Sequence, residues 1–340
     1  MSRIKLGKTG LVVEQHGFGA LPIQRIPEKD AVYLLRKAWD GGMDFFDTAR
    51  FYTNSEECVG LALADVRDKV VIATKTMALA ADDFWEQLHF SLGQMKTDYV
   101  DIYQFHNPPF CPKPGGEDGL YDAALKAKEE GKIRFIGITN HRLSVANEAI
   151  DSGLYASLQF PFSYLAGEQD IKLPERCKEK GMALIAMKAL AGGLITDSAA
   201  ASAWLTQYDN VEAIWGIQKE KELDEFLAHM KNPPELTAER QAVIDADRAE
   251  ISGEFCRACG YCLPCPVDID IPLCARASVL LRRAPLDMVL GEEGQAKMRK
   301  VADCIECGTC SSRCPYGLDT PNLLKKNYQD FLEVLDGKDL

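Results

Sequence analysis

Short apolar runs alternate with amphipathic segments eight times over residues 17–229. The runs are too short for helices and are rich in branched and aromatic residues. They predict strands near Gly17–Ala20 and over Asp44–Thr48, Val70–Lys75, Val100–Phe105, Arg134–Thr139, Ser157–Phe160, Ala183–Lys188 and Ala213–Gly216. The amphipathic segments predict helices over Glu28–Trp39, Ser55–Leu63, Asp82–Met95, Gly119–Glu130, Leu143–Ser152, Leu173–Lys180, Ala199–Tyr208 and Lys221–His229. This alternation favours an α/β fold, a closed (β/α)8 TIM barrel, over an open doubly wound sheet. A dinucleotide-binding GxGxxG fingerprint is also missing after the first strand.

Polar residues follow three successive predicted strands. Asp47 and Tyr52 follow the segment MDFF at the end of one predicted strand. Lys75 ends the segment VVIATK, and His106 ends VDIYQFH. In a parallel barrel the carboxyl ends of the strands form the reaction face, so these four residues are candidate catalytic groups. The alternative is an ordinary ion pair between Asp47 and Lys75 with two rim residues beside it. Their placement at three strand ends in succession favours catalysis.

The chemistry of the four side chains suggests a role for each. Tyr52 is the candidate general acid for a carbonyl oxygen, and a neighbouring Lys75 would lower its pKa from about 10. Asp47 would keep Lys75 charged and oriented. His106 would donate a hydrogen bond to the same carbonyl oxygen.

The segments LGKTGL, FFDTARFYTNSE, ATKT, YQFHNP and MKALAGG occur in the order typical of the aldo/keto reductase family, and the chain resembles that family over about Lys5–Glu225. The resemblance assigns Asp47, Tyr52, Lys75 and His106 to the family's catalytic tetrad. It also implies a nicotinamide cofactor, NAD(P)H, held without a Rossmann domain, and hydride transfer to a small-molecule carbonyl substrate.

The same resemblance implies a set of cofactor contacts. Asn140 and Gln159 match positions that contact the nicotinamide amide, and Phe162 matches an aromatic that stacks on its ring. The remaining implied contacts lie in the loop after the seventh strand and around the eighth: Met187, Lys188, Leu190, Gly192, Gly216, Lys219, Glu222 and Glu225. In the alternative reading Phe162 is a core residue and Gly192–Gly193 an ordinary turn.

Glu222 bears on the choice of cofactor. It stands where the family commonly offers a polar or basic residue to the adenosine 2′-phosphate, and a carboxylate there should repel a phosphate. We therefore expect NADH to be preferred over NADPH. Lys219 and Lys221 work against this expectation, because either is long enough to reach a phosphate.

Nine of the twelve cysteines fall between residues 256 and 314, and eight of these nine are closely spaced. They form two runs, Cys256, Cys259, Cys262 and Cys265 before Pro266, and Cys304, Cys307, Cys310 and Cys314 before Pro315. The second run has the C-x2-C-x2-C-x3-C-P spacing of bacterial ferredoxins, and the first is one residue shorter before its last cysteine. We expect two [4Fe–4S] clusters. Zinc is the weaker alternative, since it needs only CxxC pairs.

In ferredoxins with two clusters the fourth cysteine of each run binds the other cluster. By this resemblance Cys314 would join Cys256, Cys259 and Cys262, and Cys265 would join Cys304, Cys307 and Cys310. The shortened spacing before Cys265 leaves this exchange open. Helical patterns such as IPLCARASVLLRRA separate the runs and favour an α-helical ferredoxin-like module. We place the barrel at 1–250 and this iron–sulfur domain at 251–340.

The formal charge of −12 argues against binding to nucleic acid or to an anionic membrane surface. The sequence contains neither a signal-peptide core nor an apolar run long enough to span a bilayer, so we expect a cytoplasmic protein.

Three functions are compatible with these features. The first and preferred one is a carbonyl reductase whose clusters exchange electrons with a redox protein partner. The second is an electron-transfer subunit that passes electrons between a nicotinamide or flavin and a partner, with the barrel as scaffold. A flavin is the usual intermediary between hydride and single-electron carriers, although no motif supports one here. In the third the clusters are structural.

Overall fold

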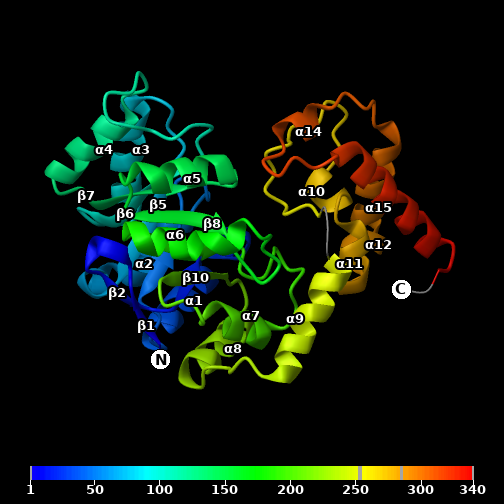
Figure 1. Ribbon diagram of the computed structural model, residues 1–340, viewed down its shortest axis with the longest axis horizontal. Helices are drawn as coiled ribbons and strands as arrows, with labels where there is room; N and C mark the ends of the chain where they lie inside the picture. Colours follow the sequence, from blue (N-terminus) through cyan, green and yellow to red (C-terminus); the bar gives the residue numbers. More distant parts are fainter. Residues whose placement is uncertain (1, 252–254, 284–285, 339–340) are drawn as a thin grey trace. The chain divides into compact units, whose positions relative to one another are not determined.

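Eight parallel strands close into a barrel in the computed structural model of the chain, which describes residues 2–251, 255–283 and 286–338 (Figure 1). The barrel strands are β3 (His16–Gly19), β4 (Phe45–Asp47), β5 (Val71–Thr76), β6 (Val100–His106), β7 (Ile133–Thr139), β8 (Ser157–Pro161), β9 (Ala183–Met187) and β10 (Val211–Gly216). They pair in sequence order, and β10 closes the barrel against β3. The predicted (β/α)8 barrel is confirmed, with strand ends that differ by no more than about two residues.

Helices follow the barrel strands as predicted. They are α1 (Glu28–Asp40), α2 (Ser55–Leu63), α3 (Ala81–Gln94), α4 (Leu120–Glu129), α5 (Leu143–Ser152), α6 (Leu173–Lys180), α7 (Ser198–Leu205) and α8 (Glu220–Lys231). Gly153 and Gly181 end α5 and α6 in the left-handed conformation that glycine adopts at low cost.

The side chains of strand β6 alternate between the inner and the outer side of the barrel. Ile102 lies in a buried cluster with residues of the neighbouring strands, whereas Tyr103 and Phe105 contact the ring of Phe84 on α3. Because side chains alternate across a strand, the even-numbered residues of β6 share the inner side of the barrel. Gln104 and His106 therefore lie on the inner side.

An antiparallel hairpin, β1 (Arg3–Lys5) and β2 (Val12–Glu14), precedes the barrel. Its apolar residues Ile4, Leu6 and Val13 are buried in one cluster with barrel residues such as Phe45 and Ile214. Fully burying an apolar side chain of this size stabilises a fold by about 1.5–3 kcal/mol. The hairpin thus closes one end of the barrel and leaves the carboxyl ends of the strands for chemistry.

The C-terminal region is helical, as the pattern between the cysteine runs predicts. Its helices are α9 (Ala238–Ile251), α10 (Ile271–Cys274), α11 (Ala277–Arg283), α12 (Asp287–Leu290), α13 (Glu292–Arg299), α14 (Thr309–Arg313) and α15 (Thr320–Leu335). They enclose a separate core that includes Cys274, Val289, Met298 and Phe331, each fully buried. Many of the other cysteines lie at the edge of this core.

The chain forms two compact units. The first comprises 1–189 and 198–238, and the second 190–197 and 239–340. Helix α9 therefore groups with the cysteine-rich unit, and so does the loop Leu190–Asp197, although it lies between β9 and α7 in the sequence. The division of the sequence at residue 250 remains a prediction about domains.

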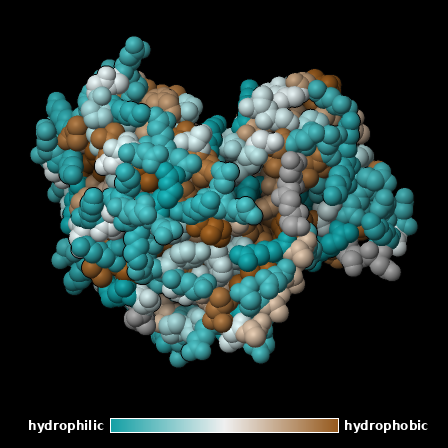
Figure 2. All heavy atoms as spheres, viewed as in Figure 1, coloured by the Kyte–Doolittle hydropathy of each residue, from teal (hydrophilic) through white to brown (hydrophobic). Residues whose placement is uncertain are grey.

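Hydrophilic residues predominate on the face that Figure 2 shows, and apolar residues are scattered among them. Among the described residues no helix combines the length and apolar character needed to cross a membrane.

Candidate functional site

Asp47 and Lys75 form a buried ion pair at the carboxyl ends of β4 and β5. Lys75 Nζ lies 2.5 Å from Asp47 Oδ1, and it also donates to the carbonyl oxygen of Thr48 at 2.6 Å. Only 2% of Lys75 and 3% of Asp47 is exposed. An ion pair this deeply buried is stable only when each charge is compensated locally, and here each charge faces the other.

Tyr52 and His106 complete the predicted group of four. Their rings meet edge to face with centroids 5.9 Å apart, and Lys75 Nζ lies 5.1 Å from the Tyr52 ring centroid. Tyr52 and His106 are half-buried, whereas the ion pair is buried. The structure thus brings all four predicted residues together, with the acid and the imidazole nearest to solvent.

The protonation states differ in one respect from the prediction. Burial, followed by the charge of Asp47, raises the pKa of Tyr52, whereas we expected Lys75 to lower it. Burial and the Asp47 carboxylate outweigh the ammonium of Lys75, whose Nζ lies 5.1 Å from the Tyr52 ring centroid. Burial lowers the pKa of His106 to about 3, with a further contribution from Lys75. At neutral pH Tyr52 therefore keeps its proton and His106 is a neutral imidazole.

Gln104 is a neighbour of the ion pair that the sequence analysis missed. Its Nε2 donates to Asp47 Oδ2 at 3.3 Å, while its Oε1 is buried without a hydrogen-bond partner among the described residues. The signal was present, because Gln104 lies two positions before His106 on one strand and therefore shares its face.

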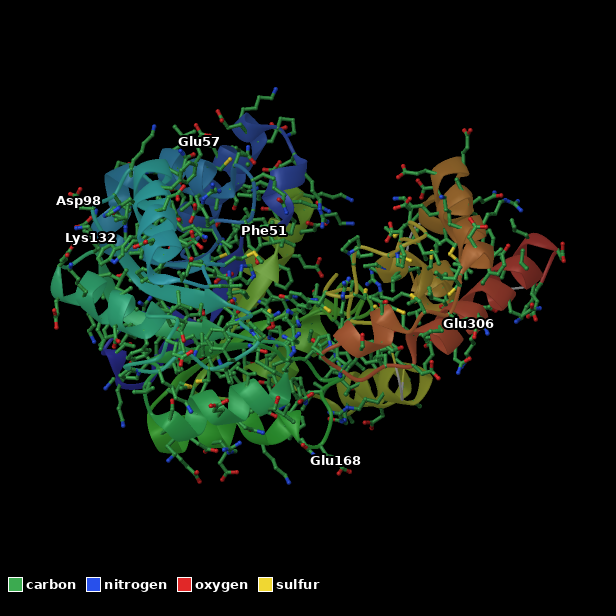
Figure 3. The ribbon with its side chains drawn as sticks, turned by 90° about the horizontal axis from the view of Figure 1, so that it is seen from above. Phe51, Glu57, Asp98, Lys132, Glu168 and Glu306 are labelled. Carbon is green, nitrogen blue, oxygen red and sulfur yellow. The ribbon has the colours of Figure 1, made fainter. Side chains whose placement is uncertain are left out.

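Apolar side chains on the loops after β3, β4 and β5 were also missed. Phe51 (Figure 3) is 68% exposed, and Leu79, Met77 and Leu21 are exposed as well. These loops leave the carboxyl ends of the strands that carry Asp47 and Lys75. Exposed apolar groups on adjoining loops often mark a binding surface.

The two residues expected at the nicotinamide amide have different surroundings. Asn140 is fully buried, and its amide donates to the carbonyl of Pro108 and accepts from the backbone of Arg142, both at 2.8 Å. Gln159 is 1% exposed, and neither of its amide atoms has a hydrogen-bond partner among the described residues. Gln159 also interacts with the carboxylate of Asp47, whose pKa it lowers, so its amide lies beside the ion pair.

Phe162 is buried among other aromatic rings. It is 1% exposed, and its ring meets those of Trp204 and Tyr208 at centroid distances of 5.1 and 5.4 Å. This geometry favours the core alternative. Nearby, Met187 ends β9, and Lys188 has a positive φ of 56°.

The remaining predicted contacts surround the start of α8. Gly216 ends β10, and Lys219 is the N-cap of α8. Glu222 Oε2 accepts hydrogen bonds from the backbone nitrogens of Gln218 and Lys219 at 3.0 and 3.1 Å. Glu225 accepts a hydrogen bond from Ser198. The Glu222 carboxylate therefore fills a helix N-terminus that would otherwise attract an anion.

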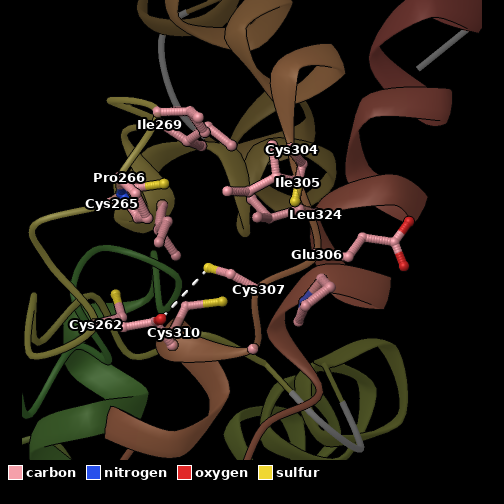
Figure 4. Close-up of a pocket in the computed structure, with 15 residues that line it drawn as sticks. Cys262, Cys265, Pro266, Ile269, Cys304, Ile305, Glu306, Cys307, Cys310 and Leu324 are labelled. Carbon is pink, nitrogen blue, oxygen red and sulfur yellow. Dashed lines mark hydrogen bonds between the residues drawn. The ribbon is translucent and has the colours of Figure 1, made fainter.

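Two pockets in the second unit are lined by the eight cysteines of the C-terminal runs. Figure 4 shows the first, of about 380 Å³, in which the sulfurs of Cys265, Cys304, Cys307 and Cys310 face a common space. Cys262 also lines it, and Cys307 donates to Thr309 at 3.4 Å. Cys307 is the exposed member of this set.

The second pocket, of about 360 Å³, is lined by Cys256, Cys259, Cys262 and Cys314. The last cysteine of each run thus lies with the first three of the other run, the exchange that the ferredoxin resemblance implies. The described cysteines form no disulfide, and no three His, Cys, Asp or Glu side chains among the described residues converge on a single metal ion. Each pocket thus gathers cysteines from both runs, and four thiolates are the number that one [4Fe–4S] cluster requires.

Comparison with known proteins agrees with both halves of this description. Residues 15–203 match the aldo/keto reductase family, and residues 255–319 match the 4Fe-4S dicluster domain. L-galactose dehydrogenase from Arabidopsis thaliana is 33% identical over 211 residues, which are 56% of this chain and 66% of that protein. The chain spans about two thirds of the length of such curated relatives.

Solved structures have the same fold. An aldo-keto reductase from Bacillus halodurans in its holo form has a TM-score of 0.64 at 22% identity and covers 73% of this chain and 96% of its own. An aldo-keto reductase from Klebsiella pneumoniae in complex with NADPH has a TM-score of 0.62 at 22% identity and covers 72% and 95%. The family match extends over more than half of the chain, through the strands that carry Asp47, Lys75 and His106. The chain therefore belongs to the aldo/keto reductase family.

Proposed function

We propose that the chain is an NAD(P)H-dependent carbonyl reductase whose two [4Fe–4S] clusters exchange electrons with a redox protein partner. The observation that carries the proposal is the buried pair of Asp47 and Lys75 beneath the half-buried Tyr52 and His106. The nicotinamide would supply a hydride to the carbonyl carbon, and the protein would supply the proton for the oxygen.

The four residues suit that proton transfer. When the carbonyl carbon receives a hydride, the oxygen takes the electron pair of the C=O bond and develops the basicity of an alkoxide, so a protonated Tyr52 is able to donate to it. The tyrosinate left behind gains from the nearby ammonium of Lys75, which Asp47 keeps charged. The neutral imidazole of His106 is able to donate a hydrogen bond that directs the same oxygen. The apolar loops around Phe51 favour a carbonyl compound with an apolar body.

Nucleotide preference follows from the start of α8. The Glu222 carboxylate accepts from two backbone N–H groups there. A 2′-phosphate at this helix terminus would have to displace a carboxylate and would be repelled by it. We therefore favour NADH, with Gln159 as the partner of the nicotinamide amide.

The eight cysteines would hold the clusters in the two groups that line the pockets. Each cluster carries one electron at a time, so the pair together would match the two electrons of a hydride. A second candidate function is an electron-transfer subunit in which the barrel binds a nicotinamide or flavin. The presence of two cysteine-lined pockets favours that candidate over a structural role, for which one cluster suffices.

Substitution of Tyr52 by phenylalanine tests the proposed reaction. We expect Tyr52→Phe to lower kcat for NADH-dependent reduction of a test aldehyde by at least about 100-fold, because the general acid is lost. NADH affinity should stay unchanged, as measured by quenching of tryptophan fluorescence. The matched control is Tyr33→Phe, which alters a tyrosine that is 52% exposed on α1. Turnover that survives in Tyr52→Phe would remove Tyr52 from its role and with it the proposed mechanism.

A further inference from the structure

Gln104 is a fully buried amide inside the barrel, on β6 beside Lys75 of the neighbouring strand β5. Its Nε2 donates to Asp47 Oδ2 at 3.3 Å, while its Oε1 has no hydrogen-bond partner among the described residues. A buried amide oxygen without a partner costs stability. The reaction proposed above assigns no role to this side chain.

The neighbouring strand β7 leaves space for Gln104. Gly137 lies opposite Gln104 in the sheet, and a Cβ at position 137 would lie 2.9 Å from Gln104 Cγ. Atoms do not approach so closely without displacement, so a larger residue at 137 would push Gln104 from its place. Packing thus holds the amide where it reaches Asp47.

The two oxygens of the Asp47 carboxylate have different partners. Oδ1 lies 2.5 Å from Lys75 Nζ, and Oδ2 accepts from Gln104. Burial raises the pKa of Asp47, and the charge of Lys75 and the amides of Gln159 and Gln104 oppose this rise. Burial also lowers the pKa of Lys75. The pair therefore stays ionised only while the carboxylate is compensated.

Other titratable groups act on this pair from neighbouring elements. Tyr52, on the loop after β4, and His106, at the end of β6, are uncharged at neutral pH. Glu56 on α2 is 3% exposed, and its carboxylate favours the charged form of Lys75. Compensation of Asp47 Oδ2 comes from neutral amides, which donate at every pH.

We propose that Gln104 is a positioning residue that keeps the Asp47 carboxylate ionised and turned toward Lys75, so that Lys75 remains charged beside Tyr52. This inference rests on the proposed function for the reaction that Tyr52 serves. Gln104 acts through Asp47 and does not exchange a proton with the substrate. When Asp47 is protonated, Lys75 loses its counter-charge and burial favours the neutral amine. Tyr52 then loses the cation that would stabilise its tyrosinate.

Gln104→Met is the first test, because methionine has a similar length and no donor. Loss of the amide raises the pKa of Asp47, so the ionised form, which is present at high pH, is lost at a higher pH as the pH falls. We expect the acid limb of the profile of kcat against pH to move up by about one pH unit, the shift that a hydrogen bond to a charged group supports. The profile is measured anaerobically on the full chain with its clusters, with NADH and a test aldehyde.

Gln104→Glu should change the opposite side of the profile. A protonated carboxyl is able to donate to Asp47 as the amide does, whereas an ionised one repels it. Activity should therefore fall as the pH rises through the ionisation of the introduced carboxyl. The matched control is Gln207→Met, at an exposed glutamine between α7 and β10, which should keep the wild-type profile.

Infrared spectroscopy follows Asp47 without turnover. The band of its protonated carboxyl is assigned by its absence in Asp47→Asn, and it should appear about one pH unit higher in Gln104→Met than in the wild type. Circular dichroism checks that each variant folds, and Gln104→Glu decides the question if Gln104→Met does not fold.

An acid limb and an infrared titration that are the same in the wild type and in folded Gln104→Met would overturn the inference and leave the proposed carbonyl reduction intact. A Gln104→Glu profile identical to that of the wild type would also overturn it. Absence of wild-type turnover would contradict the proposed function, and the infrared titration would still decide whether Gln104 keeps Asp47 ionised.

Discussion

Two carboxylates inside the barrel have opposite surroundings. Asp47 faces an ammonium at 2.5 Å. Glu212 on β10 is fully buried, and neither of its carboxylate oxygens has a hydrogen-bond partner among the described residues. Burial, followed by the charges of Asp44 and Glu14, raises the pKa of Glu212 well above its usual range. Lys75 therefore compensates the charge of Asp47 at the site. The buried carboxyl of Glu212 keeps its proton instead, which lowers the stability of the folded protein.

Glu212→Gln should stabilise the protein at neutral pH. An unfolded chain releases the glutamate proton near pH ~4.3, while the folded protein retains it to higher pH. The free energy of unfolding of the wild type therefore falls as the pH rises from ~4.3 towards the raised pKa. The glutamine variant lacks this decline, and its advantage should grow by about 1.4 kcal/mol per pH unit within that window.

Anaerobic urea unfolding at several pH values measures this advantage. Tryptophan fluorescence reports on the barrel, because all four tryptophans, Trp39, Trp85, Trp204 and Trp215, lie in the first unit. Glu179→Gln, at an exposed position on α6, serves as the control for removal of a carboxylate. A constant difference between wild type and Glu212→Gln across the pH range would show that Glu212 ionises normally in the folded protein.

At the scale of single elements, we expect the first turn of α8 to govern the nucleotide preference. Glu222→Gln removes the charge and keeps an amide oxygen that is able to accept from the Gln218 and Lys219 backbone. We expect the ratio of kcat/KM for NADPH to that for NADH to rise by at least about fivefold, because one repulsive charge beside the 2′-phosphate is worth on the order of 1 kcal/mol or more.

Glu222→Ala is the control for this prediction. It removes both the charge and the hydrogen-bond acceptor at the start of α8, so it shows how much of a change comes from a weaker helix start. If Glu222→Gln and Glu222→Arg left the cofactor ratio at its wild-type value, the carboxylate would have no part in nucleotide choice.

The strands and helices were predictable because apolar residues recur along the sequence with the period of a strand or of a helix. Strand β6 shows this most clearly, since alternation alone separates Ile102, which faces the barrel, from Phe105, which packs beneath α3. The meeting of Asp47, Lys75 and His106 was equally predictable, because parallel strands bring their carboxyl ends to one rim.

Other features depend on contacts that local sequence does not encode. Asn140 and Phe162 each already have protein contacts, Asn140 with the Pro108 carbonyl and Phe162 with the Trp204 ring on α7. The pKa of Tyr52 depends on burial and on the charge of Asp47. The loop Leu190–Asp197 groups with the second unit, in which a hydrogen bond joins Gly192 to Arg276, 84 residues away.

At the scale of the whole molecule, the two proposed chemistries involve different numbers of electrons. A nicotinamide transfers two electrons as a hydride, whereas each [4Fe–4S] cluster accepts one. Without a flavin the two processes have no direct connection. We therefore propose carbonyl reduction for the barrel and single-electron exchange with a redox partner for the cysteine-rich unit.

Anaerobic titration of the intact protein with NADH tests this assignment most directly. The purified protein should contain about eight iron atoms per chain and no flavin. Cluster absorbance and the paramagnetic signal of reduced clusters are followed during the titration, and turnover of a test aldehyde is measured in parallel. The account predicts that NADH reduces the aldehyde and leaves the clusters oxidised, and that dithionite then bleaches them. Bleaching of the clusters by NADH, in protein that does not reduce the aldehyde, would contradict the account and identify an electron-transfer subunit.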